Sequence, residues 1–124
     1  MAGYRILVVD DHKNTRDLLK LRLGQEGFEV LVAEDGSAGL AAAASEKPDA
    51  ILLDWMMPGI DGLQVLLELK HKDATKDIPV FMFTTRGKAN DVETAIANGA
   101  TGYFTKPVDP KDVGRELNRR LGST

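Results

Sequence analysis

The chain has 124 residues, the length of one domain with a hydrophobic core of its own, and its net charge of -3 gives no electrostatic reason to expect direct nucleic acid binding. It contains no Cys, which excludes disulfides and thiolate metal sites. The N-terminal stretch lacks the features of an export signal, and no apolar run reaches the roughly 20 residues that span a bilayer. We therefore expect a cytoplasmic protein without membrane insertion.

Short apolar runs alternate along the chain with segments of helical character. The runs predict strands at residues 5–10, 29–34, 50–54, 79–85 and 101–106. The helical segments lie at residues 13–27, 37–47, 62–72, 88–99 and 109–122. Because the runs show little polar alternation, each strand is expected to be covered on both faces. These elements predict an α/β fold, a (βα)5 flavodoxin-like doubly wound five-stranded parallel sheet of order 2-1-3-4-5.

The helical segments carry apolar residues at the spacing of a helix face. The first contains Leu18, Leu19 and Leu23, and the fourth contains Val92 and Ile96. Both segments are followed or ended by Gly, a common residue at helix C-termini.

Polar residues stand at the ends of four of the predicted strands. The first strand ends in Asp10 and Asp11, the third in Asp54, the fourth in Thr84 and the fifth in Lys106. In a doubly wound sheet, ligands bind beyond the carboxyl ends of the strands, at the point where the strand order reverses. We therefore expect these side chains to converge in one crevice.

Three neighbouring carboxylates repel one another unless a cation or a raised pKa relieves the repulsion. Oxygen ligands of this kind favour Mg²⁺, which typically takes one or two carboxylates together with phosphate oxygens. An ammonium and a hydroxyl beside that ion suit the oxygens of a phosphoryl group. The set therefore indicates phosphoryl transfer, with Asp54 as the candidate covalent acceptor.

Four segments in this order carry a family resemblance: "ILVVDD", "ILLDWMMPGIDG", "FMFTT" and "ANGATGYFTKP". Together they resemble the receiver domain of two-component response regulators, most closely the single-domain chemotaxis type. The resemblance covers the chain from Arg5 to about Leu121. No single motif is decisive, whereas the ordered combination is highly specific.

The resemblance implies a role for each residue of the crevice. Asp54 accepts a phosphoryl group from a sensor histidine kinase, from a phosphotransfer protein or from a small donor such as acetyl phosphate. Asp11 and Asp54, with the backbone carbonyl of Met56, bind Mg²⁺, and Asp10 orients a water on the ion. Lys106 pairs with the phosphoryl oxygens, and its peptide bond to the following Pro is cis.

The resemblance also implies a switch and its partners. Thr84 moves toward the phosphoryl group and Tyr103 turns inward, which changes the face made by the fourth helix, the fifth strand and the fifth helix. That face then meets a downstream output protein or domain. The chain is expected to be one receiver domain over residues 1–124, either stand-alone or the N-terminal part of a longer protein, and a monomer or a phosphorylation-linked dimer. It is not expected to be an enzyme beyond its own phosphorylation and dephosphorylation.

The sequence departs from the common family pattern beside the acceptor and the switch residue. Thr85 stands where a smaller residue is more usual. Met56 and Arg86 occupy positions that tune dephosphorylation, and a Met side chain cannot orient an attacking water as an amide or acid can. We therefore expect slow self-dephosphorylation.

Simpler interpretations of single residues remain open at this point. Asp10 and Asp11 could cap the first helix, and the pair Tyr103 and Phe104 should place one ring in the core and the other outside. Further residues are expected to be packing, rim or surface residues without a metal-binding role, namely Trp55, Met56, Met57, His12 and His71.

Other functional classes are also considered. Haloacid-dehalogenase-like phosphatases carry an aspartyl nucleophile after a strand, but they need a second Asp two positions later, where this chain has Met56. A nucleotide- or flavin-binding module is disfavoured because no glycine-rich phosphate-binding motif follows the first strand. The third alternative is a receiver that acts as a scaffold without being phosphorylated.

Overall fold

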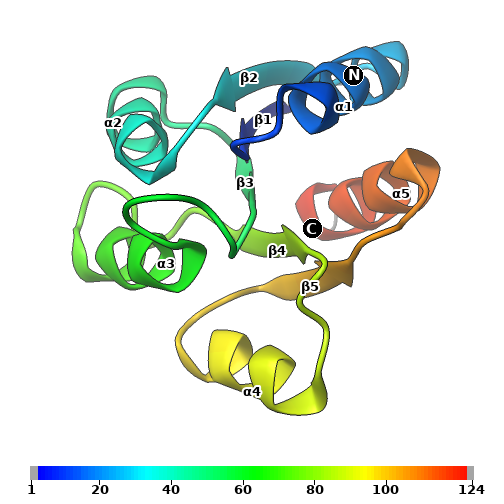
Figure 1. Cartoon of the computed structure of the whole chain (residues 1–124). Coiled ribbons are helices and arrows are strands. Elements are labelled where there is room, and N and C mark those ends of the chain that lie inside the picture. Colours follow the sequence, from blue (N-terminus) through cyan, green and yellow to red (C-terminus); the bar gives the residue numbers. More distant parts are fainter. Residues whose placement is uncertain (1–2, 123–124) are drawn as a thin grey trace.

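Five strands and five helices alternate along the part of the chain, residues 3–122, that the computed structural model describes (Figure 1). The strands are β1 (Arg5–Val9), β2 (Glu29–Ala33), β3 (Ala50–Leu53), β4 (Val80–Thr84) and β5 (Gly102–Thr105). The helices are α1 (Lys13–Gln25), α2 (Gly36–Glu46), α3 (Gly62–His71), α4 (Ala89–Ala97) and α5 (Pro110–Leu121). Each predicted strand is found within one residue at either end.

The strands form one parallel sheet in the order β2-β1-β3-β4-β5, as predicted. The strand order reverses between β1 and β3, where Val9 pairs with Leu53. Asp10 and Asp54 directly follow these two residues, so the register places them side by side at the carboxyl edge of the sheet. The N–H of Asp54 donates to the carbonyl of Val9 at 3.0 Å.

Helices cover both faces of the sheet, and each face has its own apolar core (Figure 1). Leu7 and Val9 of β1 face the core that α2, α3 and α4 cover, whereas Ile6 and Val8 face the core that α1 and α5 cover. This burial on both sides explains why the strands read as apolar runs without alternation. None of the helices in the described part of the chain combines the length and the apolar character needed to cross a membrane.

The helix faces follow the predicted spacing only in part. Leu19 and Leu23 are buried in α1, but Leu18 is 46% exposed. In α4 the buried residue is Ala95, and Ile96 is 46% exposed. Apolar spacing locates a helix, but which of two adjacent apolar residues is buried depends on how the helix is rotated against the sheet.

Tyr103 and Phe104 alternate between the two faces of β5 as expected, but neither ring lies outside. Tyr103 and Phe104 are both half-buried, because Tyr103 packs against the core under α2–α4 and Phe104 against the core under α1 and α5. Since helices cover both faces of β5, neither ring points freely outward. The bond between Lys106 and Pro107 is cis, as the resemblance implies.

The first residue of α3 allows the chain to turn tightly after Asp54. Gly62 donates its N–H to the carbonyl of Trp55 at 2.7 Å. A Cβ at this position would lie 2.5 Å from the Cα of Trp55 and closer still to the carbonyl oxygen of Asp54. Because these neighbours are backbone atoms, only glycine fits without moving the loop.

We predict that Gly62→Ala lowers the free energy of unfolding by about 2 kcal/mol or more, because the added methyl group overpacks this loop. Gly24→Ala is the matched control, since Gly24 lies exposed in α1 with nothing within 4 Å of its added Cβ. The control should be neutral or stabilising by up to about 1 kcal/mol. Urea unfolding measures both, and equal effects would contradict the proposed close contact.

Candidate functional site

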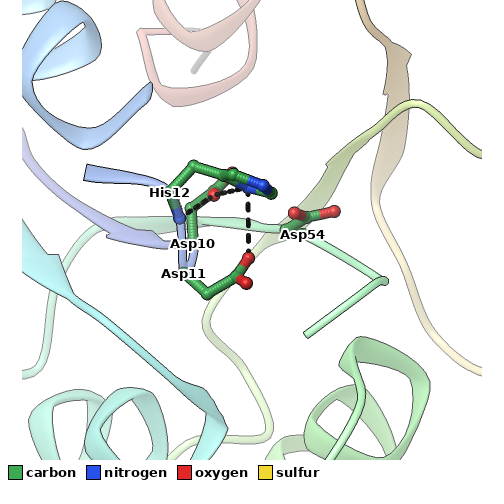
Figure 2. A group of neighbouring side chains, drawn as sticks. All are labelled: Asp10, Asp11, His12 and Asp54. Carbon is green, nitrogen blue, oxygen red and sulfur yellow. Dashed lines mark hydrogen bonds and ion pairs between the residues drawn. The ribbon is translucent and has the colours of Figure 1, made fainter. Parts of the chain in front are cut away.

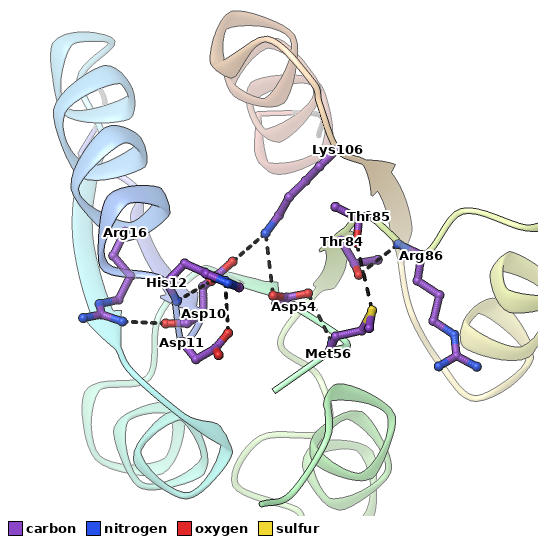
Figure 3. Close-up of polar contacts among 10 residues, drawn as sticks. All are labelled: Asp10, Asp11, His12, Arg16, Asp54, Met56, Thr84, Thr85, Arg86 and Lys106. Atoms are coloured by element: carbon purple, nitrogen blue, oxygen red, sulfur yellow. Dashed lines mark hydrogen bonds and ion pairs between the residues drawn. The ribbon is translucent and has the colours of Figure 1, made fainter. Parts of the chain in front are cut away.

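The residues predicted to converge do so at the carboxyl ends of the strands (Figure 3). Asp10 and Asp11 follow β1, Asp54 follows β3, Thr84 ends β4 and Lys106 follows β5. All five therefore come from backbone whose position the sheet determines.

Asp10 is the most completely buried carboxylate of the site, with 1% of its side chain exposed. Its Oδ2 accepts a hydrogen bond from Lys106 Nζ at 2.8 Å, and its Oδ1 accepts one from the backbone N–H of His12, also at 2.8 Å. The guanidinium of Arg16 donates to the carbonyl of Asp10 at 2.8 Å. The side chain is thus held in one orientation, and it does not cap α1, whose N-cap residue is His12.

Asp54 is 4% exposed, and its Oδ2 lies 3.6 Å from Lys106 Nζ. The backbone N–H of Met56 donates to its Oδ1 at 3.3 Å. Burial raises the pKa of Asp54, and the positive charge of Lys106 offsets part of that effect. The negative charge of Asp10 raises the pKa further.

The carboxylates outnumber the cations that touch them. Lys106 contacts Asp10 and Asp54 and packs over the ring of Phe83 at 5.1 Å. Asp11 lies outside this contact, and its Oδ1 is a buried atom without a hydrogen-bond partner. Its neighbour, the Nδ1 of His12, is 3.2 Å away in a geometry that does not make a hydrogen bond. A buried acceptor of this kind requires a partner.

Ligand atoms of Asp10, Asp11, His12 and Asp54 all lie within 4.8 Å of one another (Figure 2). Oxygen donors that share one small space, carry excess negative charge and include an unpaired atom suit a hard divalent cation. The residues therefore fit the Mg²⁺ expected from the sequence.

The two predicted switch residues are connected through Arg86. Thr84 is fully buried, and its Oγ1 accepts the backbone N–H of Arg86 at 3.2 Å. The hydroxyl of Tyr103 donates to the carbonyl of the same residue. The guanidinium of Arg86 pairs with Asp91 at 3.1 Å and lies 4.4 Å from the centre of the Trp55 ring.

On the side of Asp54 and Thr84, the rim of the site carries Met56 and Thr85, whose side chains do not act as acids or bases near neutral pH. Met56 is 56% exposed, and the hydroxyl of Thr85 faces its sulfur at 4.0 Å. Trp55 and Met57 are buried, so the expectation that these three residues serve packing or form the rim is confirmed.

Sequence reasoning missed two contacts of the site, those of Arg16 and His12. The guanidinium of Arg16 donates to the backbone carbonyl of Asp10, and the sequence carries no signal for such a contact. His71 lies exposed at the end of α3, as expected for a surface residue. His12 is also exposed, but its ring lies against the carboxylates. The position of His12 directly after Asp10 and Asp11 could have predicted this contact from the sequence.

The comparisons with known proteins agree with this fold and site. The family model described as "Response regulator receiver domain" matches residues 6–118. The chain is 40% identical over 117 residues to the Protein PilH of Pseudomonas aeruginosa, covering 94% of this chain and 97% of PilH. It is 37% identical over 124 residues to the phosphate regulon transcriptional regulatory protein PhoB of the same organism, covering 100% of this chain and 54% of PhoB.

Solved structures show the same likeness. The chemotaxis protein CheY4 of Vibrio cholerae superposes with a TM-score of 0.89 at 31% identity, over 97% of this chain and 99% of CheY4. The chain spans about half the length of the PhoB relatives that it matches.

The chain belongs to the response regulator receiver domain family. It is therefore a phospho-accepting switch of two-component signal transduction. The sequence-based resemblance to chemotaxis-type receivers is confirmed by PilH and CheY4.

We predict that Asp54→Asn raises the free energy of unfolding of the metal-free protein by roughly 1 kcal/mol near neutral pH. Burial raises the pKa of Asp54, so the folded state disfavours the charge that Asn lacks, while Lys106 keeps its contact with Asp10. This cost of burying the charge is absent below pH 3.8, the usual pKa of an aspartate, grows as the pH rises from there to the higher folded pKa, and is constant above it.

Urea unfolding of both proteins across a pH series measures this difference. The difference in the free energy of unfolding should shrink as the pH falls toward 3.8, where the carboxyl group becomes protonated in both states. A variant less stable than the wild type at neutral pH would show that Asp54 contributes more through its hydrogen bonds than its buried charge costs.

Proposed function

We propose that Asp54 is the acceptor of the phosphoryl group and that the donor is a phosphohistidine of a sensor kinase or phosphotransfer protein, or a small acyl phosphate. The observation that carries this proposal is the position of Asp54, buried at the switch point between β1 and β3 and 3.6 Å from Lys106. A carboxylate oxygen of Asp54 forms the new P–O bond as the donor P–N or P–O bond breaks. The electron pair stays on the leaving nitrogen or oxygen.

We infer that Asp11, Asp54 and the backbone carbonyl of Met56 hold Mg²⁺, and that Asp10 acts through a water. When bound, Mg²⁺ supplies positive charge to the oxygens of the transferring group. The unpaired Oδ1 of Asp11 supports this assignment. Asp10 also holds the ammonium of Lys106 close to the acceptor, at 2.8 Å from its own Oδ2.

Lys106, which follows the edge strand β5, contributes a second positive charge. Its ammonium moves from the carboxylates to the oxygens of the phosphoryl group, since both are anionic and lie within reach of the same side chain. Because positioning and charge neutralisation carry most of the catalysis of phosphoryl transfer, no general base beyond the acceptor is needed.

The proposed output begins at Thr84. Its hydroxyl turns toward the phosphoryl group and gives up the hydrogen bond from the N–H of Arg86. Tyr103 then leaves the carbonyl of Arg86 and turns inward. Both changes alter the surface formed by α4, β5 and α5, which binds the downstream partner.

The cellular setting is a proposal of the same kind. The chain acts in the cytoplasm as a switch without a catalytic turnover of its own, does not bind nucleic acid directly, and is a monomer or a phosphorylation-linked dimer. Its relatives carry names from transcriptional regulation and chemotaxis, so the output is a further protein or domain of that kind.

We predict that Asp54→Asn abolishes Mg²⁺-dependent labelling by acetyl phosphate, since the amide cannot form the acyl phosphate. Asp61→Asn is the matched control, because Asp61 is exposed and caps α3 through Gln64, a role that Asn also fills. Intact-mass spectrometry counts the added phosphoryl groups. Full labelling of the Asp54 variant would place the acceptor on another residue.

We also predict a long-lived phosphoryl group, because Met56 and Thr85 on the rim cannot activate a water for attack. Met56→Asn should shorten the lifetime several-fold by adding an amide that orients water. Decay of the labelled protein after removal of acetyl phosphate measures it. Leu67→Asn, an exposed substitution on α3, is the control and should leave the lifetime unchanged. An unchanged or longer lifetime in the Met56 variant would overturn this interpretation.

A further inference from the structure

His12 adds an imidazole nitrogen to a site otherwise made of oxygen ligands. Its Nδ1 lies 3.2 Å from Oδ1 of Asp10 and 3.2 Å from Oδ1 of Asp11. Figure 2 shows the ring between these two carboxylates and Asp54. The side chain is 67% exposed, so burial does not force the ring into this position.

The ring of His12 does not cap helix α1, although the residue lies at the N-cap position. Instead its backbone N–H donates to Asp10 at 2.8 Å, and the ring turns toward the acids. The side chain therefore faces the crevice and not the helix end.

A hydrogen bond from the ring does not account for the whole arrangement. A proton on Nδ1 can serve Asp10 Oδ1, which already accepts the backbone N–H of His12. Asp11 Oδ1, at the same distance from the ring, stays buried without a partner. One cation that accepts electron pairs from Nδ1 and from Asp11 Oδ1 satisfies both of these groups, while Asp10 keeps the hydrogen bond from the backbone.

The spacing of these atoms suits neighbouring ligands of a small ion. Metal–ligand distances of about 2.0–2.2 Å place two ligands at right angles about 3 Å apart. The distance of 3.2 Å between Nδ1 and Oδ1 of Asp11 agrees with that value. Asp54 also has an oxygen within 4.8 Å of the other ligand atoms.

We propose that His12 is a metal ligand that makes this site prefer divalent transition-metal ions, of which Ni²⁺ and Zn²⁺ are the probes, over Mg²⁺. Imidazole binds these ions well, whereas Mg²⁺ favours oxygen. The inference rests on the proposed function, because the carboxylates are those assigned to Mg²⁺. It adds a specificity-determining residue and a second class of ion to that site.

The test uses Trp55, the only Trp of the chain, which is buried and follows Asp54 directly. Its fluorescence is followed while Mg²⁺, Ni²⁺ or Zn²⁺ is added to the unphosphorylated protein at one mildly alkaline pH. Wild type, His12→Ala and His71→Ala are compared. The last is the matched control, since His71 is the only other histidine and lies exposed at the end of α3.

We expect His12→Ala to weaken Ni²⁺ and Zn²⁺ binding by about tenfold or more and to weaken Mg²⁺ binding by much less. His71→Ala should match the wild type with every ion. As a spectroscopic check, Zn²⁺ should shift the imidazole ¹H–¹⁵N signals of His12 at Nδ1 and leave those of His71 in place.

Two different failures are distinguishable. If the wild type binds Mg²⁺ but His12→Ala loses affinity for all three ions equally, or for none, the role of His12 is overturned and the proposed function stands. If the wild type binds no Mg²⁺ at this site, the proposed function itself fails.

Discussion

The ion pair between Lys106 and Asp10 is the interaction on which the site depends. It joins the end of β5 to the end of β1 over a sequence separation of 96 residues, and it places one ammonium beside a buried carboxylate pair. Because Lys106 contacts only two of the three carboxylates, the site retains excess negative charge and an unpaired acceptor on Asp11. A divalent cation suits that imbalance, so the electrostatic repulsion that costs stability also creates the capacity to bind a cation.

In the proposed switch, the backbone of Arg86 connects the site to the output surface. Arg86 receives contacts from Thr84 and from Tyr103, and its guanidinium is held by Asp91 and Trp55. Its N–H and its carbonyl therefore contact side chains of two different strands, Thr84 of β4 and Tyr103 of β5. In the proposed switch, a change at the acceptor reaches the surface of α4, β5 and α5 through the loop that contains Arg86.

The elements that were predicted well are those whose signal is a local run of residues. Each strand was found within one residue because burial on both faces requires an uninterrupted apolar segment. The rotation of the helices was predicted less well: Leu18 and Ile96 are exposed, and Ala95 takes the buried place in α4. Tyr103 and Phe104 alternate between faces as expected, but neither is outward, because α4 and α5 cover both faces of the edge strand.

The sequence by itself determined the parallel sheet and the identity of the residues at its carboxyl edge, because apolar runs, strand ends and ordered motifs are written along the chain. The tertiary structure alone decided that Lys106 pairs with Asp10, that Arg86 links Thr84 to Tyr103, and that the ring of His12 lies against the acids. These contacts depend on rotamers and on backbone groups brought together by the sheet register. No spacing along the chain encodes them.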